Sequence, residues 1–149
     1  MIEYTVKVDE KGTKYWYLND LLHRIGGPAI ECADGTKEWY LNGERHRVDG
    51  PAVEWASGQK SWCFNGKLHR VGGPAVEYPF GTKYWYRDGE LHREDGPAIE
   101  CADGTKEWFL NGFRYSEKEY WNQLKPAKEL TVAEIEALLG LRIKVVGNA

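Results

Sequence analysis

Residues 35–57 read G-T-K-E-W-Y-L-N-G-E-R-H-R-V-D-G-P-A-V-E-W-A-S, and this order recurs every 23 positions along the chain. Four full copies span 12–34, 35–57, 58–80 and 81–103, and a partial fifth copy begins at 104. A fixed period of this length is typical of an array built from one supersecondary unit. The tryptophans that mark the register are Trp16, Trp39, Trp62, Trp85 and Trp108.

Each copy contains two short segments typical of β-strands. In the second copy these are residues 36–41 and 52–55, which are rich in β-branched and aromatic residues. Asn42-Gly43 follows the first segment, and this dipeptide accepts the positive φ angles of a tight hairpin turn. The unit is therefore predicted to be a β-hairpin. The first copy carries Asn19-Asp20 at this place, so we expect a more strained turn there.

Consecutive hairpins predict a mainly β fold, an antiparallel meander forming a single elongated twisted sheet of about ten strands. We divide the chain into an N-terminal strand (1–11), the repeat array (12–112) and a small α/β C-terminal cap (113–149). In the cap, Ser116 to Glu119 is a capping box that opens a helix to about Leu124. A second capping box at 131–134 opens a helix that Gly140 ends, and 141–146 is predicted to be a last strand.

Composition excludes several classes of protein. The chain has 149 residues, with 20 Lys and Arg against 23 Asp and Glu, so the whole chain carries no strong nucleic-acid signal. No apolar run is long enough to cross a bilayer, and we expect no membrane association and a cytoplasmic location. The cysteines are widely spaced, which indicates neither a disulfide framework nor a metal site: Cys32, Cys63 and Cys101.

The alternation of side chains predicts two apolar faces. Trp39 and its equivalents are expected opposite small alanines, such as Ala52, on one face. Val53 and Tyr40, with their equivalents, are expected on the other face. The repeated lysines and glutamates should oppose one another across each second turn, and Glu31 is accordingly expected opposite Lys37. The tryptophan row could instead be a stacking platform for nucleobases.

The His-Arg pairs are the main polar feature of the repeats. As structural groups, the histidines would cap loop carbonyls, and each arginine would pair with a glutamate of the same or the next copy. As functional groups, unpaired arginines would form a strip suited to phosphates or to an acidic protein surface. Parallel imidazoles at roughly 10 Å intervals could not converge on a metal, and near-identical environments do not suit catalysis. The candidate binding residues are His23, Arg24, His46, Arg47, His69, Arg70, His92 and Arg93.

A site for one specific partner should also break the symmetry of the array. Trp55, Tyr78 and Phe80 form a candidate aromatic patch in the middle of the array, with extra packing as the alternative. The other candidates that depart from the repeat are Arg45, Lys67, Arg87 and Phe113.

These units resemble MORN-type repeats, which share the 23-residue period, the hairpin, and aromatic, Asn-Gly and His signals like residues 39–46. The resemblance covers residues 12–112 and departs from the family where Arg24 and its equivalents follow the histidine and where Gly-Pro-Ala is added. The units are also similar to His-Arg and Gly-Pro-Ala repeats of uncharacterised phage and bacterial proteins. The resemblance implies an interaction scaffold.

We therefore expect a non-enzymatic protein, without catalytic residues, cofactor or metal, that binds a macromolecular partner. Resemblance to phage proteins suggests a phage-encoded inhibitor of a bacterial defence component, with a protein as its partner. The alternative is a protein that sequesters a nucleotide or signal molecule on an Arg, His and aromatic surface. Because both sheet faces are apolar, self-association as a homodimer is also expected.

Overall fold

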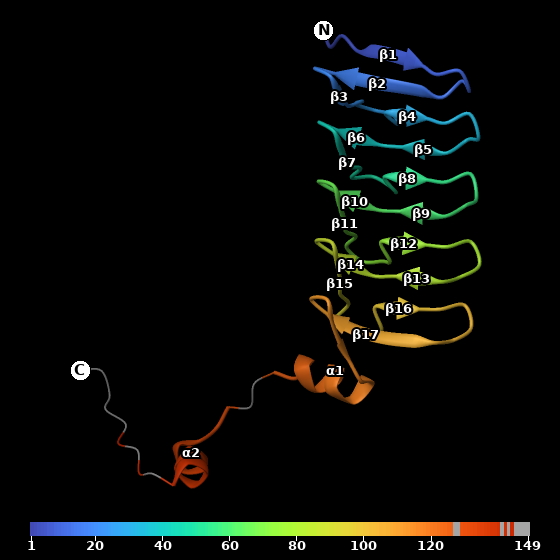
Figure 1. The fold of residues 1–149 in the computed structure, drawn as a ribbon. Coiled ribbons are helices and arrows are strands. Elements are labelled where there is room, and N and C mark those ends of the chain that lie inside the picture. Colours follow the sequence, from blue (N-terminus) through green and yellow to red (C-terminus); the bar gives the residue numbers. More distant parts are fainter. Residues whose placement is uncertain (127–128, 141, 143, 145–149) are drawn as a thin grey trace.

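A stack of hairpins runs the length of the repeat array in the computed structural model (Figure 1), which describes residues 1–126, 129–140, 142 and 144. A 12-stranded antiparallel sheet forms its spine, and the mainly β prediction is confirmed. Its strands are β1 (Thr5–Val8), β2 (Lys14–Leu18), β3 (Leu21–Leu22), β4 (Ile30–Glu31), β5 (Lys37–Glu38), β8 (Val53–Glu54), β9 (Lys60–Ser61), β12 (Val76–Glu77), β13 (Lys83–Tyr84), β16 (Ile99–Glu100), β17 (Lys106–Leu110) and β18 (Phe113–Tyr115).

Three short hairpins branch from the spine at the same end of its strands (Figure 1). They are β6 (Tyr40–Leu41) with β7 (Glu44–Arg45), β10 (Cys63–Phe64) with β11 (Lys67–Leu68), and β14 (Tyr86–Arg87) with β15 (Glu90–Leu91). The strand predicted over 36–41 is thus interrupted at Trp39, whose N–H donates to the Ala52 carbonyl while its own carbonyl accepts from His46 N–H. Each such tryptophan therefore joins the spine to a branching hairpin.

The hairpin turns have the backbone that their sequence predicts. Asn42 and Gly43 take φ angles of 51° and 82°, both in the left-handed region. Asp20 takes φ of 61° where the later copies have glycine. The first turn therefore holds a residue with a β-carbon in the left-handed region, and its greater strain stays a prediction.

Side chains are distributed over the two faces as the alternation predicts. The Ala29 carbonyl accepts from Trp16 N–H, and Ala29 N–H donates to the Glu38 carbonyl, which places this fully buried alanine between the segments that carry Trp16 and Glu38. Lys37 lies opposite Glu31 on one side and Glu54 on the other, so the predicted register is confirmed. Val53 and Val76 are buried on the opposite face.

Two helices follow the array, as predicted. Helix α1 (Glu117–Leu124) and helix α2 (Val132–Leu139) both begin at complete capping boxes, and Gly140 ends α2 in the left-handed conformation. Helix α1 packs against β17 and β18 at the end of the sheet, whereas α2 buries none of its residues and lies away from the sheet (Figure 1). The strand predicted at 141–146 lies outside the described residues, apart from isolated positions 142 and 144. Within the described ranges, neither helix is long and apolar enough to span a membrane.

Candidate functional site

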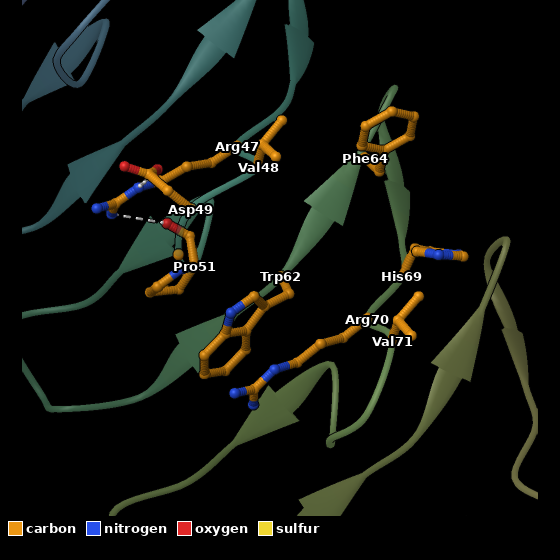
Figure 2. A pocket seen from close by; sticks show the side chains of 10 residues that line it. Arg47, Val48, Asp49, Pro51, Trp62, Phe64, His69, Arg70 and Val71 are labelled. Carbon is orange, nitrogen blue, oxygen red and sulfur yellow. Dashed lines mark hydrogen bonds and ion pairs between the residues drawn. The ribbon is translucent and has the colours of Figure 1, made fainter.

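Each repeated arginine lies flat against the tryptophan of its own copy. The Cζ atom of Arg47 is 3.9 Å from the ring centroid of Trp39, and the other three copies have nearly the same distance. Stacking of this kind is favourable because the face of an indole is electron-rich. One face of each of these tryptophans is therefore occupied by the protein's own guanidinium group. Figure 2 shows Arg70 alongside Trp62 in the third copy.

The same arginines are bound by hydrogen bonds within their own copy. Arg47 Nη1 donates to the Pro51 carbonyl at 3.1 Å and to Glu54 Oε1 at 3.0 Å. The predicted pairing of arginine with a glutamate of its own copy is thus confirmed. In the first copy, Glu31 accepts from Arg24 in the same way, although Lys37 is the residue opposite it in the sheet.

The second and fourth loops add a carboxylate that the first and third loops lack. Asp49 Oδ1 accepts from Arg47 Nε at 3.0 Å, and Asp95 accepts from Arg93 Nε at 2.7 Å. These hydrogen bonds hold the pKa of both carboxyl groups below its usual value. The equivalent positions in the other two loops are Gly26 and Gly72, which have positive φ angles.

Each histidine fastens its copy to the next one. His23 Nδ1 accepts from the backbone N–H of Asn42 at 3.0 Å, and the same contact recurs between His46 and Asn65. The prediction that the histidines cap loop carbonyls is therefore wrong, because these imidazoles accept hydrogen bonds from turn amides. An accepting Nδ1 places the proton of a neutral imidazole on Nε2. The remaining pairs are His69 with Asp88 and His92 with Asn111.

The four histidines do not converge on one centre. The imidazoles lie in separate copies, each bound to the turn of the following copy. Among the described residues, no group of three or more His, Cys, Asp or Glu side chains is arranged to hold a metal ion. The candidate binding residues of the His-Arg pairs therefore form the framework of the loops, and their role in binding a partner stays a prediction.

An apolar row lies at the tips of these loops, at the position after each arginine. The exposed fractions of Ile25, Val48 and Val71 are 63%, 83% and 88%. Grooves separate successive loops, and the groove between the second and third loops has a volume of about 690 Å³ (Figure 2). Trp62, Phe64 and the two valines line that groove. We call Ile25, Val48 and Val71 the loop row.

The loop row ends in the fourth copy, where its position holds Glu94. Arg87 Nη1 donates to Glu94 Oε1 at 3.0 Å, so an ion pair takes the place of Phe64 and Val71 in the third copy. His92 Nε2 also donates to Glu94, and these bonds lower the pKa of that carboxyl group. Arg87, predicted as a symmetry-breaking residue, therefore marks the boundary of the exposed apolar positions.

The predicted aromatic patch lies on the face of the sheet opposite the loop row. Tyr78 stacks on Phe80 with ring centroids 5.1 Å apart. Tyr78, Trp55 and Arg45 line a hollow of about 510 Å³. Phe80 is exposed beside it and is not among its lining residues. The structure thus brings three of the predicted residues to one place.

Two features of the surface escaped the sequence prediction. The loop row could have been found from the apolar residue that follows His-Arg in three copies, in a loop otherwise rich in Gly, Asp and Pro. The hollow could have been found from Ser61 and Cys63, which replace larger side chains at two repeat positions. Both signals are departures from what a solvent-exposed loop or a filled sheet face requires.

Comparison of the chain with models of protein families and with curated proteins gives no match.

Proposed function

We propose that this protein is a binding scaffold without catalytic activity and that it engages a protein partner through the loop row. The observation that carries the proposal is the exposure of Ile25, Val48 and Val71 on rigid loops at equivalent positions of successive copies. The kinship with MORN-type interaction scaffolds, proposed from the period and the hairpin, is in keeping with this function.

Burial of the loop row supplies a driving force for association. Covering one aliphatic side chain of this size contributes roughly 1.5 to 3 kcal/mol. The loops that carry these side chains are held by the stacked and hydrogen-bonded arginines. A preorganised surface loses little conformational entropy on binding, so more of that contribution remains as affinity.

The ion pair of Arg87 with Glu94 supports a limited footprint for the partner. Interface cores are depleted in charged residues, whereas rims are polar. The partner is therefore proposed to cover the first three loops and to end near the fourth. The simplest protein partner is a second copy of this chain, bound through the same loop row. Such self-association would account for the expected homodimer.

The test disrupts the loop row with glutamate, the residue that already occupies the equivalent position of the fourth copy as Glu94. The photo-crosslinking amino acid p-benzoylphenylalanine is placed at position 48, and irradiation in cells is followed by electrophoresis. We expect a discrete protein adduct, either a second copy or a different protein. The adduct should be lost when Val71→Glu is added.

The matched control carries the crosslinker at Ser57, which lies in an exposed second turn at the other end of the strands. An adduct of the same mass at both positions, or no adduct at position 48, contradicts the proposal. Light scattering of the purified wild type and of Val48→Glu/Val71→Glu then separates the two partners. A mass that falls from dimer to monomer identifies the second copy, and an unchanged mass identifies a different protein.

A further inference from the structure

The third copy stands apart from an otherwise symmetrical array. Residues 12–17 are identical to 81–86, and 28–43 match 97–112 except that Phe109 replaces Tyr40. These stretches of the first two copies therefore have close counterparts in the fourth and fifth, whereas residues 58–66 of the third copy differ from every other copy at Gln59, Ser61, Cys63 and Phe64. A specialised site is expected where the repetition fails, since packing alone would favour the common residues.

Two adjacent positions on one face become small in this copy. Ser61 stands where the other copies have Tyr15, Glu38, Tyr84 and Glu107. Cys63 stands where the others have Tyr17, Tyr40, Tyr86 and Phe109. Loss of two large side chains from one stretch of sheet opens the hollow of about 510 Å³, within the usual range for small-molecule sites.

The walls of the hollow are aromatic. Trp55 and Tyr78 enter from the two turns that flank the third copy, at positions that hold cysteine in the first and fourth copies. Tyr84 and Tyr86 come from the next copy, and Tyr78 meets Tyr84 edge to face with ring centroids 5.9 Å apart. Such walls suit a planar ring, which can stack on one aromatic side chain and meet another edge-on.

Polar groups that line the hollow have unused hydrogen-bonding capacity. Ser61 is only 4% exposed, and its hydroxyl makes no hydrogen bond with any other described residue. The same holds, within the described part of the chain, for the hydroxyls of Tyr78, Tyr84 and Tyr86. By contrast, the hydroxyl of Tyr40 in the second copy donates to Glu38. These hydroxyls reach solvent in the hollow and are free to donate to a ligand with acceptor atoms.

The charge at the hollow favours an anion over a cation. Arg45 is the charged residue among those that line it. Its Nε and Nη2 atoms bind Glu38, while Nη1 makes no hydrogen bond to another described residue. An aromatic cage for a quaternary ammonium would not place a guanidinium at its edge. Burial raises the pKa of the Tyr84 and Tyr86 hydroxyls above its ordinary value, and both hydroxyls are donors at neutral pH.

We propose that this hollow binds a small planar anion, an aromatic ring that carries a phosphate or a carboxylate. The ring lies between the aromatic walls, and the anionic group meets Arg45 Nη1. Ser61 and the tyrosine hydroxyls donate to acceptor atoms of the ligand. The site is on the opposite face of the sheet from the loop row and is independent of the protein-binding function proposed above.

The test is titration calorimetry with adenosine monophosphate and benzoate as the two anionic probes, and with adenosine and inorganic phosphate as controls. We expect the wild type to bind at least one anionic probe below millimolar concentration, and each control at least tenfold more weakly. Binding of adenosine monophosphate but not benzoate indicates that the ligand is a nucleotide. Binding of benzoate but not adenosine monophosphate indicates that it is an aromatic carboxylic acid. Failure of both anionic probes at millimolar concentration overturns the proposal.

The repeat supplies the variants that locate the site. Ser61→Tyr/Cys63→Tyr restores the residues of the fourth copy and should abolish binding by filling the hollow. Arg45→Leu, which introduces the residue found at this position in the first, third and fourth copies, should weaken anion binding by about tenfold or more. Thermal unfolding shows whether each variant folds. If Ser61→Tyr/Cys63→Tyr does not fold, Arg45→Leu still tests the proposal. Binding that persists in folded filled protein or in Arg45→Leu overturns the proposal, whereas Val48→Glu/Val71→Glu should bind as the wild type does.

Discussion

The guanidinium of Arg47 lies 3.9 Å from the ring centroid of Trp39, and the backbone of Gly50 closes its other side. A β-carbon built on Gly50 would stand 2.8 Å from Arg47 Cζ, closer than real contacts allow. The tryptophan, the arginine and the glycine of Gly-Pro-Ala are therefore one packing unit. One face of each tryptophan in these four copies is consequently covered by the chain's own arginine.

This packing unit makes Gly50→Ala a destabilising change, because the guanidinium that it displaces is held in place. The added methyl group must displace the guanidinium, which breaks its stacking and its bonds to Pro51 and Glu54. We expect a loss of about 1 to 3 kcal/mol in the free energy of unfolding, measured by urea titration. In an Arg47→Ala background the same substitution should cost much less, because the clashing group is gone. Equal costs in both backgrounds would show that the glycine acts through some other contact.

The first hairpin turn offers a stabilising substitution. Asp20 has φ of 61°, and Asp20→Gly removes the strain of a side chain in the left-handed region. We expect a gain of about 0.5 to 1 kcal/mol, or roughly 2 to 3 °C in the melting temperature. Asp20→Ala is the control, since it removes the charge and keeps the β-carbon. A similar gain from alanine would assign the effect to charge.

Tyr120 fastens helix α1 to the last His-Arg loop. Its hydroxyl donates to the Arg93 carbonyl at 2.6 Å and accepts from Gly96 N–H at 3.1 Å. Tyr120→Phe should lower the free energy of unfolding by about 1 to 2 kcal/mol, because a buried amide loses its partner. Hydrogen exchange should accelerate at Gly96 and remain unchanged at Gly50, which lies two copies away. Acceleration spread evenly over all four loops would contradict a local role.

Acid should loosen the second and fourth loops. Arg47 and Arg93 hold the pKa of Asp49 and Asp95 below its unfolded-state value. The stability that this provides is complete above about pH 4 and is lost as the pH falls through the folded-state pKa. Asp49→Asn/Asp95→Asn should therefore give a shallower loss of stability on acidification below about pH 4, measured by denaturant unfolding. The difference from the wild type should shrink near 1 M salt, and an identical pH profile for both proteins would contradict the assignment.

Much of the fold could be predicted because its determinants are local. Asn42-Gly43 and its equivalents specify tight turns, and the strict period brings each strand into register with the next. The capping boxes at Ser116 and Thr131 are local as well. The break of each strand at the tryptophan was not predicted, because it depends on hydrogen bonds from Trp39 to two different segments.

The candidate site was harder to predict because its geometry is not local. The sequence shows Trp39 and Arg47 as separate recurring positions, and only the folded loop places one on the other. The histidines were assigned to carbonyls because a turn amide of the following copy, such as that of Asn65 for His46, lies 19 residues away. The hollow depends on two residues that are small, and a missing side chain gives a weaker signal than a charged one.

Because His46 bonds to Asn65 much as His69 bonds to Asp88, the joints between neighbouring copies are interchangeable. Excision of residues 58–80 would bring His46 to the turn of the following copy in the same register. The shortened chain would keep the contacts at both ends of the array, where the Tyr4 hydroxyl accepts from Ile25 N–H and the Tyr120 hydroxyl accepts from Gly96 N–H. Length is thus an adjustable property of this molecule, since a copy such as the third could be removed without leaving an unmatched joint.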